Sequence, residues 1–123
     1  ETDLPPKEFR KFIELFENDK VKANYDTGNS SALGYNMKEE FKEIGKYFAN
    51  IHIKDRKFQG DTVPLGYGNV DFELFFNELA KIDYNGELII QGARQDFKEN
   101  YIKTCKEYLK IVKQYLDKYN KVD

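Results

Sequence analysis

The sequence predicts an α/β fold in which parallel strands alternate with helices. Two observations support this fold class. Four segments carry apolar residues at helical spacing, and three short apolar runs lie between them, each followed by polar residues. No hairpin signal joins these runs, so successive strands should be connected through helices, as neighbouring parallel strands are.

The four expected helices are marked by apolar stripes that we expect to form the core. The first begins after Pro5 and Pro6, because proline is favoured in the first turn of a helix. Asp96 is the expected cap of the last helix. The stripes consist of Phe9, Phe12, Ile13 and Phe16, of Met37, Phe41, Ile44 and Phe48, of Phe72, Phe75, Phe76 and Leu79, and of a broad face between Tyr101 and Leu116.

Three strands are expected over residues 21–26, 50–55 and 88–91, where apolar residues lead into polar ones. Residues 27–36 are expected to form a turn and a loop, and residues 56–69 a long polar loop, since both are rich in small and polar residues. Three parallel strands cannot close a barrel, and they leave an unpaired edge before Val21. The sheet is therefore expected to need further strands.

Composition argues against several classes of partner. The chain has 123 residues with 20 basic and 22 acidic side chains, which gives a formal net charge of −2. This balance offers no positive surface to nucleic acid, and no apolar run approaches the ~20 residues of a membrane span. No signal peptide is recognisable, so we expect a cytoplasmic location. Cys105, the only cysteine, is expected to be a small buried residue of the last helix.

Polar residues gather at the ends of the predicted strands. In a parallel α/β protein these ends meet at one edge of the sheet, where ligands bind. Two carboxylates and an imidazole at that edge would form a divalent-metal site suited to Mn²⁺, Zn²⁺, Co²⁺ or Mg²⁺. The residues placed there are Asp26 after the first strand, His52, Lys54 and Asp55 after the second, Gln91 and Arg94 after the third, and Glu1, which would end a strand further upstream.

The same residues have plainer interpretations. An aspartate at a strand end is often the cap of the following helix or turn. A single histidine is often a hydrogen-bonded polar residue rather than a ligand, and residues 54–56 also suit a solvated loop with local ion pairs. Residue type and spacing alone leave both the metal site and these alternatives open.

Four stretches of the sequence resemble one protein family. They are Tyr25-Asp26-Thr27-Gly28-Asn29, Ile51-His52-Ile53-Lys54-Asp55-Arg56, residues 63–72 (VPLGYGNVDF) and residues 82–88 (IDYNGEL). They are similar to the xylose-isomerase-like barrel family of sugar-phosphate isomerases and epimerases, which includes ribulose-phosphate 3-epimerases and ketose 3-epimerases. The similarity covers essentially the whole chain, in order.

The resemblance implies a (β/α)₈ TIM barrel. Residues 1–123 would be a single partial domain of it, the C-terminal part from the end of strand five through helix eight. By position, Glu1, Asp26, His52 and Gln91 would be the metal ligands from strands five to eight. Glu1 and Gln91 would also stand where related epimerases carry their acid/base groups. The implied reaction is proton transfer next to a ketose carbonyl through a metal-stabilised enediolate.

The same resemblance implies contacts with a sugar or sugar phosphate. Asn29, Lys54, Arg56 and Arg94 would bind this small molecule. Relatives usually carry glutamate where this chain has Gln91. Glutamine can offer its carbonyl oxygen to a metal, but it cannot carry a proton. Gln91 is therefore compatible with metal binding and does not supply a second acid/base group.

Two other functions stay open. One is a non-catalytic relative that binds a sugar or a partner and has lost the eighth-strand glutamate. The other is a metal-dependent endonuclease of the same superfamily, although such enzymes carry more histidines than the single His52 of this chain. As a partial barrel, the chain is expected to associate with a second copy or with its missing half, and to be inactive alone.

Overall fold

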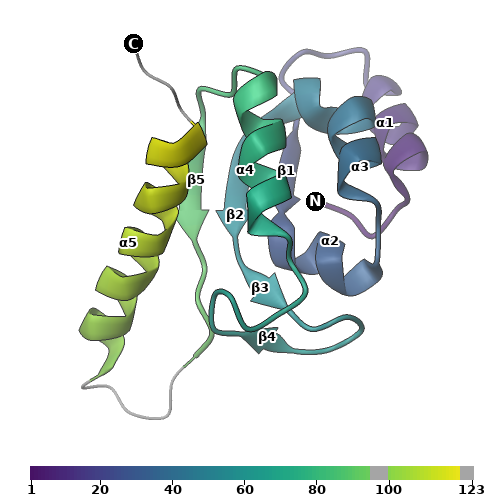
Figure 1. Cartoon of the computed structure of the whole chain (residues 1–123). Coiled ribbons are helices and arrows are strands. Elements are labelled where there is room, and N and C mark those ends of the chain that lie inside the picture. Colours follow the sequence, from purple (N-terminus) through teal and green to yellow (C-terminus); the bar gives the residue numbers. More distant parts are fainter. Residues whose placement is uncertain (95–99, 120–123) are drawn as a thin grey trace.

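The computed structural model describes residues 1–94 and 100–119 (Figure 1). Strands and helices alternate along the chain, as the sequence predicts. The helices are α1 (Pro6–Glu14), α2 (Thr27–Leu33), α3 (Met37–Ile44), the short 3₁₀ helix η1 (Gly45–Tyr47), α4 (Phe72–Lys81) and α5 (Tyr101–Tyr119). The strands are β1 (Ala23–Asp26), β2 (Phe48–Ile53), β3 (Asp55–Arg56), β4 (Thr62–Val63) and β5 (Glu87–Ile90).

A three-stranded sheet in the order β1-β2-β5 lies at the centre of the molecule. Both strand pairs in it are parallel, which confirms the predicted fold class. The register aligns Asp26 with His52 and His52 with Ile89. Side chains alternate between the two faces along each strand, so these three aligned residues share one face of the sheet.

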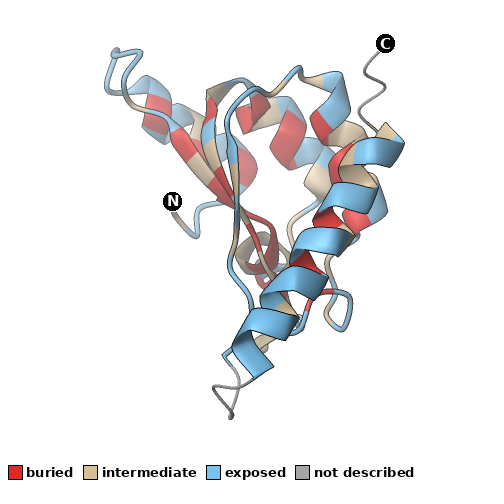
Figure 2. Cartoon of the chain, turned by 90° about the vertical axis from the view of Figure 1, so that its left-hand side faces the viewer, coloured by how far each residue is buried: buried red, intermediate tan, exposed pale blue. Residues whose placement is uncertain are grey.

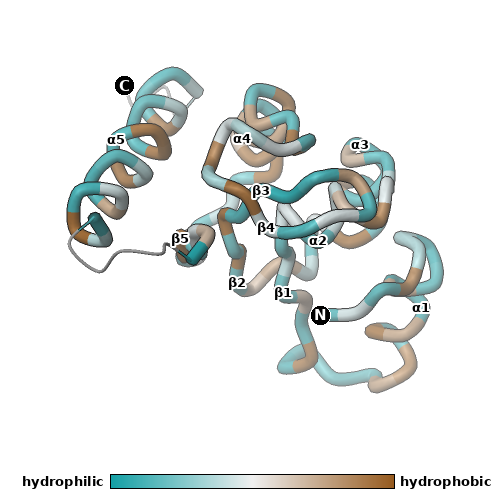
Figure 3. Tube along the Cα trace, turned by 90° about the horizontal axis from the view of Figure 1, so that it is seen from below, coloured by the Kyte–Doolittle hydropathy of each residue, from teal (hydrophilic) through white to brown (hydrophobic). Residues whose placement is uncertain are grey.

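The opposite face of the sheet carries the core. Tyr25, Ile51 and Ile53 are buried on the side that α3, α4 and α5 cover (Figures 2 and 3). The ring of Tyr25 stacks on those of Phe48 and Phe75, with centroids 4.8 Å and 6.1 Å apart. Aromatic pairs of this kind add to the stabilisation that burial alone provides. The stripes around Phe41 and Phe75 form the core as expected. The first stripe does so only through Phe9 and Ile13, because Phe12 is 44% exposed and Phe16, beyond the end of α1, is 51% exposed. In the last stripe, Tyr101 and Leu109 are exposed.

The face that carries Asp26 and His52 is more open. Asn50 and His52 are partly exposed, and Ile89 is 42% exposed. Figure 3 looks onto the carboxyl ends of the strands, where the N-terminal segment and α2 lie next to β1. Side chains of this open face can therefore meet residues that follow the strands.

The segment after β2 contains a hairpin that the sequence does not predict. Asp55 pairs antiparallel with Val63, and Arg56 pairs with Thr62. Each of the two strands has only two residues, so no alternation of apolar and polar residues marks them. The expectation of an unbroken loop over residues 56–69 without a hairpin is therefore wrong.

Asp55 organises the rest of this segment. Its side chain is 1% exposed and accepts the backbone N–H groups of Gly66, Gly68 and Val70 at 2.9, 2.9 and 3.2 Å. A Cβ atom on Gly68 would lie 2.0 Å from Asp55 Oδ1, so only glycine fits that position. The solvated-loop interpretation is wrong for Asp55, because its carboxylate is buried and its hydrogen-bond partners lie 11 to 15 residues later in the chain.

A short helix occupies the predicted turn and loop after β1. The Asp26 side chain caps α2 by accepting the backbone N–H of Asn29 at 2.8 Å. The helix ends at Gly34, whose φ of 79° lies in the left-handed region that glycine tolerates. Five of the seven residues of α2 are glycine or small polar residues, and a helix of this length without an apolar stripe gives no periodic signal.

Other details shift by a few residues. Phe48 belongs to β2 rather than to the preceding helix, because η1 ends the helical segment at Tyr47.

Cys105 is exposed, so the expectation of a buried thiol is wrong; α5 instead buries Tyr108 and Val112. Asp96 lies outside the described residues. Across residues 1–94 and 100–119, no helix combines the length and apolar character needed to cross a membrane.

Candidate metal centre

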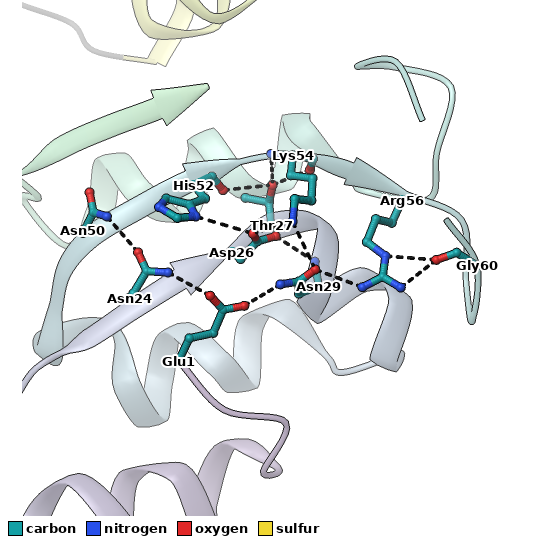
Figure 4. A network of polar contacts seen from close by, with 10 residues as sticks. All are labelled: Glu1, Asn24, Asp26, Thr27, Asn29, Asn50, His52, Lys54, Arg56 and Gly60. Atoms are coloured by element: carbon teal, nitrogen blue, oxygen red, sulfur yellow. Dashed lines mark hydrogen bonds and ion pairs between the residues drawn. The ribbon is translucent and has the colours of Figure 1, made fainter. Parts of the chain in front are cut away.

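Three side chains of metal-ligand type converge at the carboxyl edge of the sheet (Figure 4). Glu1 comes from the N-terminal segment, Asp26 ends β1, and His52 lies in β2. One ligand atom from each of these residues lies within 4.8 Å of the other two. The structure therefore brings together three of the four residues that the resemblance implies as ligands.

The two carboxylate oxygens of Asp26 have different partners. The residue is 3% exposed, and its Oδ1 accepts the backbone N–H of Asn29 at the start of α2. Its Oδ2 lies 3.7 Å from His52 Nδ1 and 3.2 Å from Lys54 Nζ. One oxygen is thus committed to capping the helix, while the other faces the site.

This geometry fits a divalent cation. Bonds from Zn²⁺ to nitrogen and oxygen are about 2.1 Å long, which places two ligands of a tetrahedral ion about 3.4 Å apart. The 3.7 Å between His52 Nδ1 and Asp26 Oδ2 is close to that separation. A carboxylate oxygen of Glu1 lies within 4.8 Å of the ligand atoms of Asp26 and His52. It completes a set of one nitrogen and two oxygen donors. Such a set suits Zn²⁺, Mn²⁺ and Co²⁺, and does not by itself select one ion.

Two asparagine amides hold the carboxylate of Glu1. The Nδ2 group of Asn24 donates to Oε2 at 3.0 Å, and that of Asn29 donates to Oε1. Asn24 is oriented in turn by Asn50, whose Nδ2 donates to Asn24 Oδ1 at 2.9 Å. Glu1 is exposed, and these bonds give its side chain a defined position facing Asp26 and His52. Asn24 and Asn50 lie two residues before Asp26 and His52, so the expectation that site residues follow the strands does not include them.

Lys54 and Arg56 lie on the far side of Asn29 from Glu1. Lys54 Nζ is 3.5 Å and Arg56 Nη1 is 2.9 Å from Asn29 Oδ1. The remaining guanidinium donors of Arg56 reach the carbonyl of Gly60 at 2.9 Å and 2.7 Å. Three of the four residues implied as substrate contacts, Asn29, Lys54 and Arg56, thus lie beside the metal-ligand cluster.

Thr27 joins the carboxyl ends of β1 and β2. Its buried hydroxyl accepts the backbone N–H of Lys54 at 2.9 Å and donates to the Lys54 carbonyl at 2.6 Å. Next to it, a Cβ atom on Gly28 would lie 2.7 Å from Cγ of Lys54, so glycine leaves room for the lysine stem. The sequence gives no signal for this role of Thr27, since its partner is 27 positions away.

Gln91 and Arg94 follow β5. The backbone N–H of Gln91 donates to the carbonyl of Ile53 at 2.9 Å, which extends the pairing of β2 and β5 by one step. Both residues are exposed, and Arg94 lies at a cleft between β5 and α5 that Tyr108 also lines. Within the described part of the chain, the Gln91 side chain makes no hydrogen bond to Glu1, Asp26 or His52.

A buried carboxyl group lies behind the site. Glu40 of α3 is 3% exposed and accepts hydrogen bonds from the hydroxyls of Tyr25 at 2.9 Å and Ser30 at 2.6 Å. Burial raises its pKa from 4.5 to about 7. Glu40 thereby ties α3 to β1 and α2, the two elements that carry Asp26 and Asn29. The sequence places Glu40 in a helix and gives no sign that it faces inward.

The comparison with protein families agrees with this geometry. Residues 5–114 match the family model described as xylose isomerase-like TIM barrel. The chain belongs to this family. The parallel sheet therefore belongs to a TIM-barrel architecture. The described residues contribute the parallel strands β1, β2 and β5 with their helices.

Curated relatives of this chain carry the names of a sugar-phosphate epimerase and an inosose dehydratase. SgbU from Haemophilus influenzae, provisionally named an L-ribulose-5-phosphate 3-epimerase, is 33% identical over 96 residues, which cover 72% of this chain and 34% of SgbU. The inosose dehydratase of Geobacillus kaustophilus is 31% identical over 130 aligned positions, which cover 90% of this chain and 41% of the dehydratase. The chain thus spans less than half the length of these relatives.

Solved structures show the same fold at low sequence identity. A xylose isomerase domain protein from Planctomyces limnophilus matches 97% of this chain and 46% of its own length, with a TM-score of 0.79 and 21% identity. The IOLI protein, solved with a zinc atom bound, matches 93% of this chain and 44% of its own length, with a TM-score of 0.73 and 19% identity. The zinc atom is a feature of the IOLI structure, and the similarity to this chain is one of fold.

Proposed function

We propose that this chain supplies the divalent-metal centre of a sugar or sugar-phosphate isomerase or epimerase. The observation that carries the proposal is the convergence of Glu1, Asp26 and His52 within 4.8 Å at the carboxyl edge of the parallel sheet. Gln91, at the end of the next strand, would add its side-chain oxygen as a fourth ligand. The epimerase and dehydratase names of the relatives support a small polyhydroxylated substrate.

Each residue of the site has a role in this proposal. A bound divalent cation would polarise the substrate carbonyl and stabilise the charge that develops on its oxygen. Glu1, held by two amides, is the group that moves the proton at the carbon next to the carbonyl. Lys54, whose Nζ lies 3.2 Å from Asp26 Oδ2, donates to a hydroxyl or phosphate oxygen. Asn29, Arg56 and Arg94 are the further proposed substrate contacts.

A second candidate reaction is the loss of water from a polyhydroxylated ketone. It is favoured by the 31% identity to an inosose dehydratase over 90% of the chain, and by Gln91, which cannot carry a proton. In such an elimination, one base removes the proton next to the carbonyl and the electron pair forms the new double bond. The neighbouring hydroxyl then leaves as water with the proton that the base took up. Glu1 alone could act in both steps of this elimination.

We also propose that residues 1–123 act as a single partial domain, from the end of the fifth barrel strand through the eighth helix. Within the described residues, β1 and β5 each pair on one side only. A cleft of about 790 Å³ between β5 and α5 is lined by apolar side chains such as Ile90 and Leu109. The rest of the barrel, or a second copy of the chain, would cover these features.

The reaction can be tested by hydrogen exchange. The whole protein with Mn²⁺ would be incubated in deuterated water with a panel of ketoses and ketose phosphates, and the products analysed by mass spectrometry. An isomerase or epimerase incorporates deuterium next to the carbonyl, whereas a dehydratase yields a product that lacks one water. Glu1→Gln should abolish either reaction, and the exposed loop variant Asp61→Asn should keep it. Exchange that survives both Glu1→Gln and His52→Ala would contradict the proposal.

A further inference from the structure

Asn29 contacts both carboxylates of the candidate metal centre. Its backbone N–H donates to Asp26 Oδ1 at 2.8 Å, and its side-chain Nδ2 donates to Glu1 Oε1. Glu1 and Asp26 come from segments 25 positions apart, and Asn29 is the residue that binds both. A single residue at the start of α2 thus fixes two of the three convergent ligands relative to each other (Figure 4).

The orientation of the Asn29 amide is set by its other neighbours. Its Oδ1 accepts from Arg56 Nη1 at 2.9 Å and lies 3.5 Å from Lys54 Nζ. Guanidinium and ammonium groups can only donate hydrogen bonds, so Oδ1 has to face them. The Nδ2 group must then face Glu1, whose carboxylate can only accept. Arg56 is itself held by the carbonyl of Gly60, so the direction of the amide rests on a fixed group.

An amide is the side chain that suits this position. It donates to the carboxylate of Glu1 without neutralising the charge that attracts a cation. A lysine or arginine here would form an ion pair with Glu1 and compete with the metal for the same oxygens. Glu1 lies in an exposed segment outside the helices and strands, where an unheld side chain would sample several rotamers. Holding it in one rotamer reduces the entropy lost when a metal binds.

We propose that Asn29 is the positioning residue of the metal centre and that Arg56 acts through it, by setting the orientation of its amide. This inference rests on the proposed function, because it concerns the ligands of that centre. It gives Arg56 a role that needs no contact with substrate. Asn24 still holds Oε2 of Glu1 at 3.0 Å, so loss of Asn29 weakens metal binding without abolishing it.

The test is calorimetric titration of Mn²⁺ into the wild type, Asn29→Ala, Arg56→Ala and the double variant. Asn29→Ala keeps the backbone N–H that Asp26 caps, so α2 should remain folded, which circular dichroism would check. Loss of the amide should weaken Mn²⁺ binding about tenfold, the lower end of the effects seen when partners of metal ligands are removed. Asn85→Ala, a matched asparagine on an exposed turn, should bind as the wild type does.

The double variant separates a positioning role from a general effect on structure. Since Arg56 acts through Asn29, Arg56→Ala should weaken binding less than Asn29→Ala does and add nothing to it. Wild-type affinity in Asn29→Ala, or full additivity of the two losses, would overturn the inference and leave the metal centre standing. If Asn29→Ala fails to fold, unchanged affinity in Arg56→Ala would overturn it. A wild type that binds no Mn²⁺ would overturn the metal centre and this inference together.

Discussion

His52 Nδ1 lies 3.7 Å from Asp26 Oδ2, and the two residues occupy paired positions on adjacent parallel strands. This contact depends on the register of β1 and β2, because a slip by one residue would turn one of the two side chains to the core face. Thr27 holds that register through two hydrogen bonds with the backbone of Lys54. The candidate metal centre is therefore built on a sheet register that a neighbouring hydroxyl secures.

Thr27→Val should destabilise the protein and weaken metal binding. Valine matches threonine in shape, but it leaves the backbone N–H and carbonyl of Lys54 without the hydroxyl that now satisfies them. Because Thr27 is 0% exposed, water does not replace that partner. We expect a loss of about 2 kcal/mol in the free energy of unfolding, measured by urea denaturation. Thr62→Val on the partly exposed β4 is the control, and an equal loss in both variants would count against this role.

Glu40 should make stability depend on pH. Because burial raises the pKa of Glu40 from 4.5 to about 7, the folded state keeps a proton that the unfolded state releases in this range. The contribution of this group to stability is therefore greatest below pH 4.5, falls as the pH rises, and levels off above about 7. A shift of this size corresponds to about 3 kcal/mol.

Glu40→Gln tests this pH dependence. The amide keeps the size of the side chain and cannot ionise, so the variant should match the wild type near pH 4.5 and exceed it in stability at about pH 8. Urea denaturation across this range measures the difference. The exposed Glu107 of α5 provides the control variant Glu107→Gln, which should follow the wild type. A stability difference between Glu40→Gln and the wild type that stays constant with pH would refute the prediction.

Asp55→Asn should loosen the segment between β4 and α4. The carboxylate of Asp55 accepts three backbone N–H groups, and an amide would offer one oxygen and turn an NH₂ group towards the others. We expect a loss of about 3 kcal/mol in stability and faster cleavage of residues 64–70 by protease. Limited proteolysis with mass spectrometry detects the cleavage. Asp61→Asn, in the exposed turn of the same hairpin, should remain as resistant as the wild type.

The fold was largely predictable because its longer helices carry apolar residues at a regular spacing that is visible in the sequence. The stripes that include Phe41 and Phe75 predict helices that pack on a sheet. Both residues are buried, as this packing requires. Short elements were not predictable. The helix α2 and the two-residue strands β3 and β4 are held by Asp26, Asp55 and backbone contacts, none of which imposes a repeating pattern on the sequence.

The candidate site was predictable to the extent that it follows from strand ends. The positions of Asp26 and His52 follow from the sequence because parallel strands bring their carboxyl ends to one edge. The roles of Thr27 and Glu40 do not follow from it, since they depend on partners brought close only by the tertiary fold. The substrate roles of Lys54, Arg56 and Arg94 remain predictions.

Calorimetric titration of Mn²⁺ into the wild type and His52→Ala tests whether Glu1, Asp26 and His52 form a metal centre, with Asp61→Asn as the control. We expect one bound ion per chain in the wild type and in the control, because Glu1, Asp26 and His52 place their ligand atoms within 4.8 Å of one another. We expect His52→Ala, which removes the nitrogen ligand, to lose this binding. No binding by the wild type, or equal binding by His52→Ala, would contradict a metal centre at this edge of the sheet.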